Sequence, residues 1–186
     1  MAQVIDFQDR AVATLRARVA EVEEANQDLI AFARGHSGAV AAIHAAVLAA
    51  IEADGLEHLI HVVTTDWTDI LNVDAVALAL HVGDVAIRAD GDGLQFVDRR
   101  VIQRVSRGID GVVLHGVERG HPLFGHAASL IRAEALIRLD NPLPLPCGLL
   151  ALGQRAPSRF ETRHGSELLG FLGATLARAV GRWLLP

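Results

Sequence analysis

The sequence predicts an α+β fold in which an antiparallel sheet is flanked by helices and preceded by a long amino-terminal coiled-coil helix. Three observations predict it. Apolar side chains recur at alternating steps of three and four over residues 5–33, strand-type segments separated by turns fill residues 73–153, and amphipathic helical patterns lie on both sides of them. We therefore expect two parts, a coiled-coil dimerisation helix over residues 1–36 and a compact domain over residues 37–186.

The amino-terminal repeat follows a heptad pattern. β-branched residues at a positions, with leucine at two of three d positions, favour two parallel strands. Asn26 falls in an a layer, where its amide would pair with its twin in a partner chain and fix the register at some cost in stability. A single amphipathic helix folded back on its own domain is the alternative, because the repeat is short and Gln8 interrupts it. The predicted dimer interface of this helix comprises Val12, Leu15, Val19, Val22, Asn26 and Leu29.

The composition excludes several functional classes. A formal net charge of −5 argues against a general nucleic-acid binder, whose affinity comes largely from cations that neutralise phosphates. All 17 cations are arginine, which excludes a Schiff-base lysine and a Walker A loop. The single cysteine, Cys147, excludes an intramolecular disulfide and a multi-cysteine zinc site, and it fits a reducing compartment.

The chain carries no signal for a membrane or for export. No apolar stretch is long enough for a membrane helix, so we expect no membrane partner. Asp6, Asp9 and Arg10 stand where a signal peptide would need an apolar core. We expect a cytoplasmic protein.

Three helices are expected before the first strand. The segment Gly35-His36-Ser37-Gly38 should end the heptad helix and offer Ser37 as a cap for the next. A second helix is predicted over residues 39–53 and a third over residues 56–71. Their expected core residues are Val40, Ile43, Val47 and Ala50 in the second, and Leu59, Ile60, Val63, Trp67 and Ile70 in the third.

The strand patterns differ along the chain. Both faces of the first strand are apolar, which predicts burial on both sides, and Gly83-Asp84 supplies a two-residue hairpin turn. Residues 134–139 alternate between polar and apolar side chains, which predicts a half-exposed strand. Residues 141–146 hold three prolines and should form a stiff loop. The expected strands cover residues 73–82, 85–88, 112–115, 134–139 and 147–153.

Two further helices are predicted. One covers residues 97–107, with Val97, Val101, Ile102 and Val105 inside and arginines outside. The other ends the chain, and it begins either near Ser158, which has capping-box spacing with Glu161, or at Gly165-Ser166. Its apolar positions at three-four spacing are a second candidate for dimer packing. They include Leu169, Leu172, Leu176 and Trp183.

The end of the chain resembles that of a GAF domain. The likeness rests on the segment Cys147-Gly148-Leu149-Leu150-Ala151-Leu152-Gly153, on Arg159-Phe160-Glu161, and on the leucine-rich terminal helix. With Ala25-Asn26-Gln27-Asp28-Leu29 added, the chain is similar to a bacterial family of unknown function that joins a coiled-coil helix to a GAF-like domain. The resemblance covers nearly the whole chain, and it implies a GAF-like (PAS/GAF-type) antiparallel sheet flanked by helices.

The resemblance also implies a sensor-like role. GAF domains commonly bind cyclic nucleotides, tetrapyrroles or metabolites in a pocket on one face of the sheet, and they commonly dimerise through flanking helices. Nothing here matches the NKxDE-type pattern of cyclic-nucleotide-binding members, and Cys147 lies on a predicted strand rather than at an evident bilin attachment site. The ligand or cofactor is therefore left unknown.

No motif predicts a catalytic or metal site. Gly35-His36-Ser37-Gly38 approaches a nucleophile elbow, but Ala39 takes the place of the last glycine and no strand precedes it. His58 and His61 are three apart on a helix, without the carboxylate-histidine pattern of a zinc site. Asp90 and Asp92 lack the further ligands of an EF-hand and are interpreted as a turn.

The best candidate for ligand binding is the connection after the strand at residues 112–115. Arginines there could bind an anionic group while a histidine senses protonation near neutral pH, with two aromatic side chains as an apolar floor. The alternative is a solvated loop whose arginines pair with Glu118 and Glu134, with the aromatic residues in the ordinary core. The candidate residues are His115, Arg119, His121, Phe124, Arg132, Arg138 and Trp67, with His126 close by.

These observations leave three hypotheses. The first is a non-enzymatic, homodimeric sensor or regulatory module that binds a small ligand or a protein partner and signals through a helical bundle. The second is a protein-protein interaction scaffold with a filled, ligand-free core. The third is an enzyme that handles phosphate with Arg119 and His121.

Overall fold

The computed structural model describes residues 7–82, 85–140, 147–157 and 163–184. The chain divides into two compact units, Met1–Val40 and Ala41–Pro186. The division lies four residues after the boundary predicted from the sequence. No helix among the described residues combines the length and the apolar character needed to cross a membrane.

The first helix, α1, is longer than the sequence suggested. It runs without interruption from Phe7 to Glu52, so the break expected at residues 35–38 is wrong. Gly35 and Gly38 are exposed, and a glycine inside a helix costs only about 1 kcal/mol relative to alanine, so these residues do not end it. The segment Gly35-His36-Ser37-Gly38 is helical, and α1 continues through it from the first unit into the second.

Side chains of the predicted coiled-coil seam are exposed in the single chain. Val19 and Val22 have 54% and 67% of their surface accessible, and Asn26 is exposed as well. Pairing of two such helices stays a prediction. The side chains of Val12, Leu15 and Leu29 lie outside the described residues.

The second unit contains one antiparallel sheet with strand order β3-β2-β1-β6-β5-β4. The sequence missed β3, because its four residues follow a turn-rich segment and are too few for their alternation to stand out. The strands are β1 (Ala75–Val82), β2 (Val85–Asp90), β3 (Gly93–Phe96), β4 (Val112–Gly116), β5 (Ala133–Leu139) and β6 (Cys147–Gln154). The hairpin turn expected at residues 83–84 and the proline loop at residues 141–146 lie outside the described residues.

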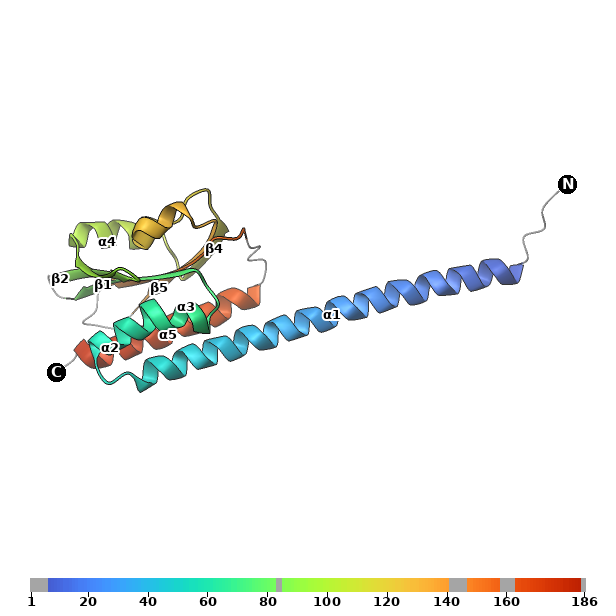
Figure 1. Cartoon of the computed structure of the whole chain (residues 1–186), viewed down its shortest axis with the longest axis horizontal. Coiled ribbons are helices and arrows are strands. Elements are labelled where there is room, and N and C mark those ends of the chain that lie inside the picture. The colour runs from blue at the N-terminus through green and yellow to red at the C-terminus, as the bar shows by residue number, and fades with distance from the viewer. Residues whose placement is uncertain (1–6, 83–84, 141–146, 158–162, 185–186) are drawn as a thin grey trace. The chain divides into compact units, whose positions relative to one another are not determined.

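Helices cover the sheet on both sides (Figure 1). One side carries the end of α1 from Ala41, a broken helix and the terminal helix. The other carries α4 (Arg99–Ser106) and the 3-10 segment η2 (Pro122–Ser129). The broken helix consists of α2 (Leu56–His61), a π turn η1 (Val62–Asp66) and α3 (Trp67–Ile70), and the terminal helix is α5 (Arg163–Leu184).

Each side of the sheet has its own apolar core, and β1 contributes to both. Val76, Leu78 and Leu80 belong to the cluster on the α5 side, while Ala77 and Ala79 belong to the cluster under α4 and η2. The prediction that both faces of this strand are buried is therefore confirmed. The small alanines leave room for side chains of α4 and η2 to lie close to the strand.

Two burial predictions are wrong. Strand β5 is buried on both faces rather than half exposed, because it lies between β4 and β6 and the layers on both sides cover it. Its buried residues include Glu134, which is 3% exposed. Val101, expected inside, is 49% exposed on α4, whereas Ile102 is buried beside it.

The terminal helix packs on the chain's own sheet. Leu172 and Leu176 are fully buried in the α5-side core, which corrects their assignment to a dimer surface. Leu169 is partly buried against the same core. Trp183 is 36% exposed, with the Arg182 guanidinium 4.8 Å from its ring centre. A Cβ added at Gly173 would overlap Ile137, so the glycine lets α5 lie close to β5.

Candidate functional site

The structure brings together only part of the predicted ligand-binding cluster. His115, His121 and the buried Glu134 meet where β4, η2 and β5 approach one another. The Glu134 carboxylate accepts a hydrogen bond from the His121 backbone N–H at 2.6 Å and lies 3.1 Å from His115 Nε2. The carboxylate therefore holds the start of η2 against the sheet.

The His121 side chain is also used within the loop. Its Nδ1 accepts a hydrogen bond from the Leu123 backbone N–H at 3.2 Å, which caps η2. Burial lowers the pKa of His121 below 6.5; the Glu134 carboxylate acts in the opposite direction and His115 adds to the lowering. The neutral imidazole, which this capping bond requires, is thus favoured in the folded chain.

The predicted arginines do not converge on an anion site. Arg132 Nη1 donates to the carbonyl oxygens of Glu118, Ser129 and Ile131 at 2.9 to 3.1 Å. Arg138 Nε donates to Asp140 Oδ1 at 2.8 Å, and Arg119 is exposed. Arg132 therefore stabilises the loop by binding its backbone carbonyls. Glu134, which the alternative interpretation paired with an arginine, contacts His115 instead.

Phe124 and Trp67 do not share a pocket floor. Trp67 is fully buried in the core on the α5 side, and its Nε1 donates to the Ala46 carbonyl at 3.1 Å. Phe124 is buried in the other core, under η2. The sheet separates the two side chains. Both are core residues, as the alternative interpretation of the sequence predicted.

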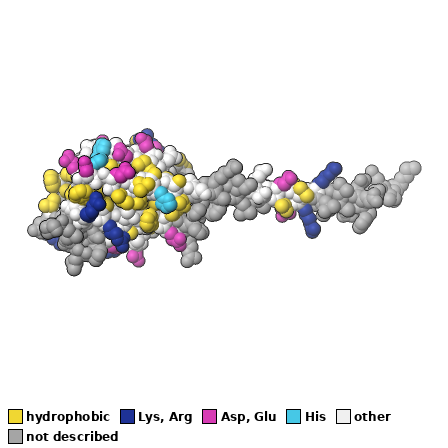
Figure 2. Space-filling view, turned by 90° about the horizontal axis from the view of Figure 1, so that it is seen from below, with side chains coloured by type: hydrophobic (Ala, Val, Ile, Leu, Met, Phe, Trp, Pro, Cys, Tyr) yellow, Lys and Arg dark blue, Asp and Glu magenta, His cyan; other side chains and the backbone are white. Residues whose placement is uncertain are grey.

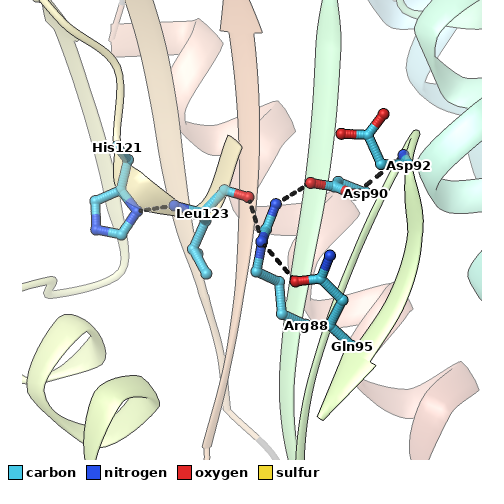
Figure 3. A network of polar contacts seen from close by, with 6 residues as sticks. All are labelled: Arg88, Asp90, Asp92, Gln95, His121 and Leu123. Atoms are coloured by element: carbon cyan, nitrogen blue, oxygen red, sulfur yellow. Dashed lines mark hydrogen bonds and ion pairs between the residues drawn. The ribbon is translucent and has the colours of Figure 1, made fainter. Parts of the chain in front are cut away.

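A polar network around Arg88 was not foreseen from the sequence (Figure 3). Arg88 Nε donates to the Leu123 carbonyl at 2.9 Å, Nη1 donates to Gln95 Oε1 at 3.1 Å, and Nη2 is paired with the Asp90 carboxylate. Both side chains of this ion pair are largely buried, at 16% and 8% exposure. The signal that could have indicated it is an arginine inside an otherwise apolar strand.

The Arg88 network fixes the conformation of η2. Gly125 has a φ of +54°, and a Cβ at this position would overlap the Arg88 guanidinium. Arg88 and Glu134 thus each anchor the same segment through its backbone. Phe124 and Leu123 lie buried beneath it, so this face of the sheet is filled around the predicted ligand site.

An open groove lies on the opposite side of the sheet. It has a volume of about 870 Å³, within the range of ligand-binding clefts. The π turn places Thr64 and Thr65 at its wall, and Thr64 Oγ1 donates to the Ile60 carbonyl at 2.9 Å. Single-turn π segments inside helices are frequent at functional sites. The lining residues are Leu56, Glu57, Ile60, His61, Thr64, Thr65, Ile87, Ala89, Asp90, Gly91, Gly93 and Leu94.

A smaller cavity of about 130 Å³ adjoins the groove at Thr64, Asp90 and Gly91. Phe124 is also among its lining residues, so this cavity lies at the end of β2 where the two layers meet. Among the predicted ligand-binding residues, Phe124 is the one that the described cavities include.

The helices around the groove are acidic. No arginine or lysine occurs between Arg34 and Arg88, whereas aspartate and glutamate recur throughout that segment. Figure 2 shows the helical side, with hydrophobic side chains spread across the face, several acidic side chains along one edge, further acidic side chains at the opposite edge, and a few cationic side chains on the same face. No group of three or more histidine, cysteine, aspartate or glutamate side chains suited to a metal is found among the described residues.

The sequence matches the family described as "Protein of unknown function, DUF484" over residues 1–185. The chain belongs to the DUF484 family. Among curated proteins, none matches the sequence.

Solved structures similar to this DUF484 protein are GAF domains and their relatives. The GAF domain of a phosphoenolpyruvate-protein phosphotransferase from Coxiella burnetii has a TM-score of 0.58 at 14% identity, covering 79% of this chain and 95% of that one. The free methionine-R-sulfoxide reductase of Neisseria meningitidis has a TM-score of 0.54 at 17% identity, and the match covers 76% of this chain and 87% of that one. The GAF domain of a putative sensor histidine kinase from Pseudomonas syringae has a TM-score of 0.51 at 13% identity, and the match covers 83% of this chain and 92% of that one.

At these identities the comparisons show the fold. The predicted family resemblance is confirmed, and the described part of the second unit is a GAF-like α+β domain with a six-stranded antiparallel sheet.

Proposed function

We propose that this DUF484 protein is a homodimeric, non-enzymatic regulatory module that binds a small ligand or a protein partner and transmits the event through paired α1 helices. The observation that carries the proposal is the continuity of α1. The helix that exposes Val19 and Val22 in its first part supplies Ile43, Ala46 and Ala50 to the core of the sheet in its second part. A change in the packing of the helix would therefore alter the core.

The polar side chains of the predicted loop have a structural role, which speaks against a catalytic one. Glu134, His121 and Arg132 each form hydrogen bonds with backbone atoms of the segment they hold, and Glu134 also contacts the His115 side chain. These are contacts of a loop support. We therefore place the enzyme hypothesis, with Arg119 and His121 as its residues, behind the regulatory one.

The filled face under η2 favours a second candidate, an interaction scaffold without a small ligand. Leu123, Phe124, Ile131 and Leu136 are buried there. Native mass spectrometry of the purified full chain separates the two candidates. A persistent non-protein mass supports the sensor, and the bare protein mass supports the scaffold.

Dimerisation is tested by placing charges in the seam. We expect the full chain to be a dimer at micromolar concentration and the double variant Val19→Glu/Val22→Glu to be a monomer, because four carboxylates would meet in adjacent layers of a parallel pair. Light scattering coupled to size exclusion measures the mass. Ala20→Glu, an exposed position of the same helix outside the seam, is the control and should remain dimeric. A monomeric wild-type chain would contradict the proposal.

A further inference from the structure

The helical layer leaves part of the sheet uncovered. The register pairs Ile87 with Phe96 and Ala89 with Leu94, so these four side chains share one face. It is the α5 side, because Ile87 and Ala89 pack with that core. Leu94 and Phe96 are nevertheless 48% and 78% exposed. The β2–β3 end of this face therefore presents an apolar floor that no described helix shields.

The groove is the border between this floor and the helical layer. Leu56 and Ile60 of α2 form an apolar wall, and Ile87, Ala89 and Leu94 form the floor. The layer that begins with the end of α1 and with α5 thus stops at α2, beside an open strip of sheet. A further helix on the strip would continue the layer and bury the exposed side chains of β3.

The charged side chains around the strip determine which charge a binding partner must carry. Glu57 lines the groove as an exposed carboxylate, and no arginine does. Asp54, Asp66 and Asp92 are exposed on neighbouring segments. The Asp90 charge is offset by Arg88, so the field comes mainly from the exposed carboxylates. Such a surface attracts cationic partners and repels anionic ones, including acidic membranes.

We propose that the strip formed by Leu56, Ile60, Ile87, Ala89, Leu94 and Phe96 binds an amphipathic helix of a partner protein whose apolar face is flanked by lysine or arginine. This is helix-in-groove recognition, with the apolar floor supplying affinity and Glu57 supplying orientation. The proposal deepens the proposed function by naming the chemistry of one partner. It does not require α1 to pair.

The test uses the isotopically labelled full chain and synthetic helical peptides of about fourteen residues. One peptide has a leucine-alanine face flanked by lysines. A second replaces each lysine by glutamate, and a third scrambles the apolar face at constant charge. We expect amide shifts in α2, β2 and β3 with the first peptide, and binding at least roughly tenfold weaker with the other two.

Two exposed positions give a matched pair of variants. Leu94→Arg places a cation on the floor and should weaken binding roughly tenfold or more. Val101→Arg, on the opposite side of the sheet at nearly the same exposure, 49% against 48%, should change it less than about twofold. Glu57→Gln should weaken binding a few-fold and reduce its salt dependence. Thermal unfolding of each variant verifies that it is folded.

The proposal is overturned by equal binding of the glutamate or scrambled peptide, by shifts centred on α4 and η2, or by unchanged binding to Leu94→Arg. A response of the same amides to phenethylamine without any to the lysine peptide would make the groove a small-molecule site and also overturn it. Light scattering on the same samples reports dimerisation separately, so failure of the strip and failure of the α1 pairing are distinguishable.

Discussion

The two faces of the sheet are closed by different means. Under α4 and η2, apolar side chains fill the face, and buried polar groups hold the covering segment from Glu134 on one side and Arg88 on the other. On the opposite face, helices pack mainly by apolar contacts, with the Trp67 hydrogen bond to the Ala46 carbonyl among them, and they stop short of β2–β3. Irregular backbone needs polar anchors because its N–H and C=O groups lack regular partners, whereas a helix satisfies its own.

Removing the largest buried side chain of the helical face should have the largest effect. Trp67→Ala leaves a cavity and frees the Ala46 carbonyl, so we expect a loss of about 3–5 kcal/mol in the free energy of unfolding. Denaturant unfolding measures it. Phe171→Ala, at 51% exposure on α5, is the control, and we expect it to cost less than about 1 kcal/mol. Equal losses would mean that Trp67 is not part of the stabilising core.

On the other face, removing the polar anchor of η2 should have a smaller and more local effect. Arg88→Ala leaves the Asp90 carboxylate buried without its cation, and we expect a loss of about 2–4 kcal/mol in the free energy of unfolding. Amide hydrogen exchange should also become faster in residues 122–129 than in α5. Arg138→Ala, which breaks a more exposed pair with Asp140, should cost under about 1 kcal/mol. Unchanged exchange in η2 would contradict the anchoring role.

The smallest expected effect is a pH dependence of the free energy of unfolding that originates from His121 at the start of η2. The folded chain lowers the pKa of His121 below 6.5, so the unfolded chain binds more protons and the free energy of unfolding decreases as the pH falls from 6.5 through the folded-state pKa. His121→Gln should flatten this part of the profile. His44→Gln, an exposed histidine of α1, should leave it unchanged. If the free energy of unfolding has the same pH dependence in the wild type and in His121→Gln, this dependence does not come from His121.

The sequence predicted most helices and strands because their signals are local. The buried alternation of β1, the apolar runs of α2 and α5, and the final strand β6 are all visible in the pattern of side chains. It failed for β3, which is too short to show a period, and for the end of the first helix, where two glycines and a serine proved insufficient to stop it.

The candidate site was less predictable than the fold. Histidines and arginines that are close in the sequence suggested one anion-binding cluster, but the structure uses Arg132 on backbone carbonyls and separates Arg138 from His121. The Arg88 pair and the open β2–β3 strip depend on which strands are neighbours and where the helical layer ends. The one local signal is an arginine within the short strand β2, and it does not indicate the partners of that arginine.

By itself, the sequence determined the α+β class, the family, the acidic character of the segment between Arg34 and Arg88, and the apolar heptad of the first helix. Periodicity, composition and motif are properties of neighbouring residues along the chain, so they can be recognised without coordinates. Only the tertiary structure decided that Leu172 and Leu176 are core, that Glu134 is buried, and that Leu94 and Phe96 stay uncovered. Burial depends on what packs against a residue from distant parts of the chain, and the same side-chain pattern is compatible with several such arrangements.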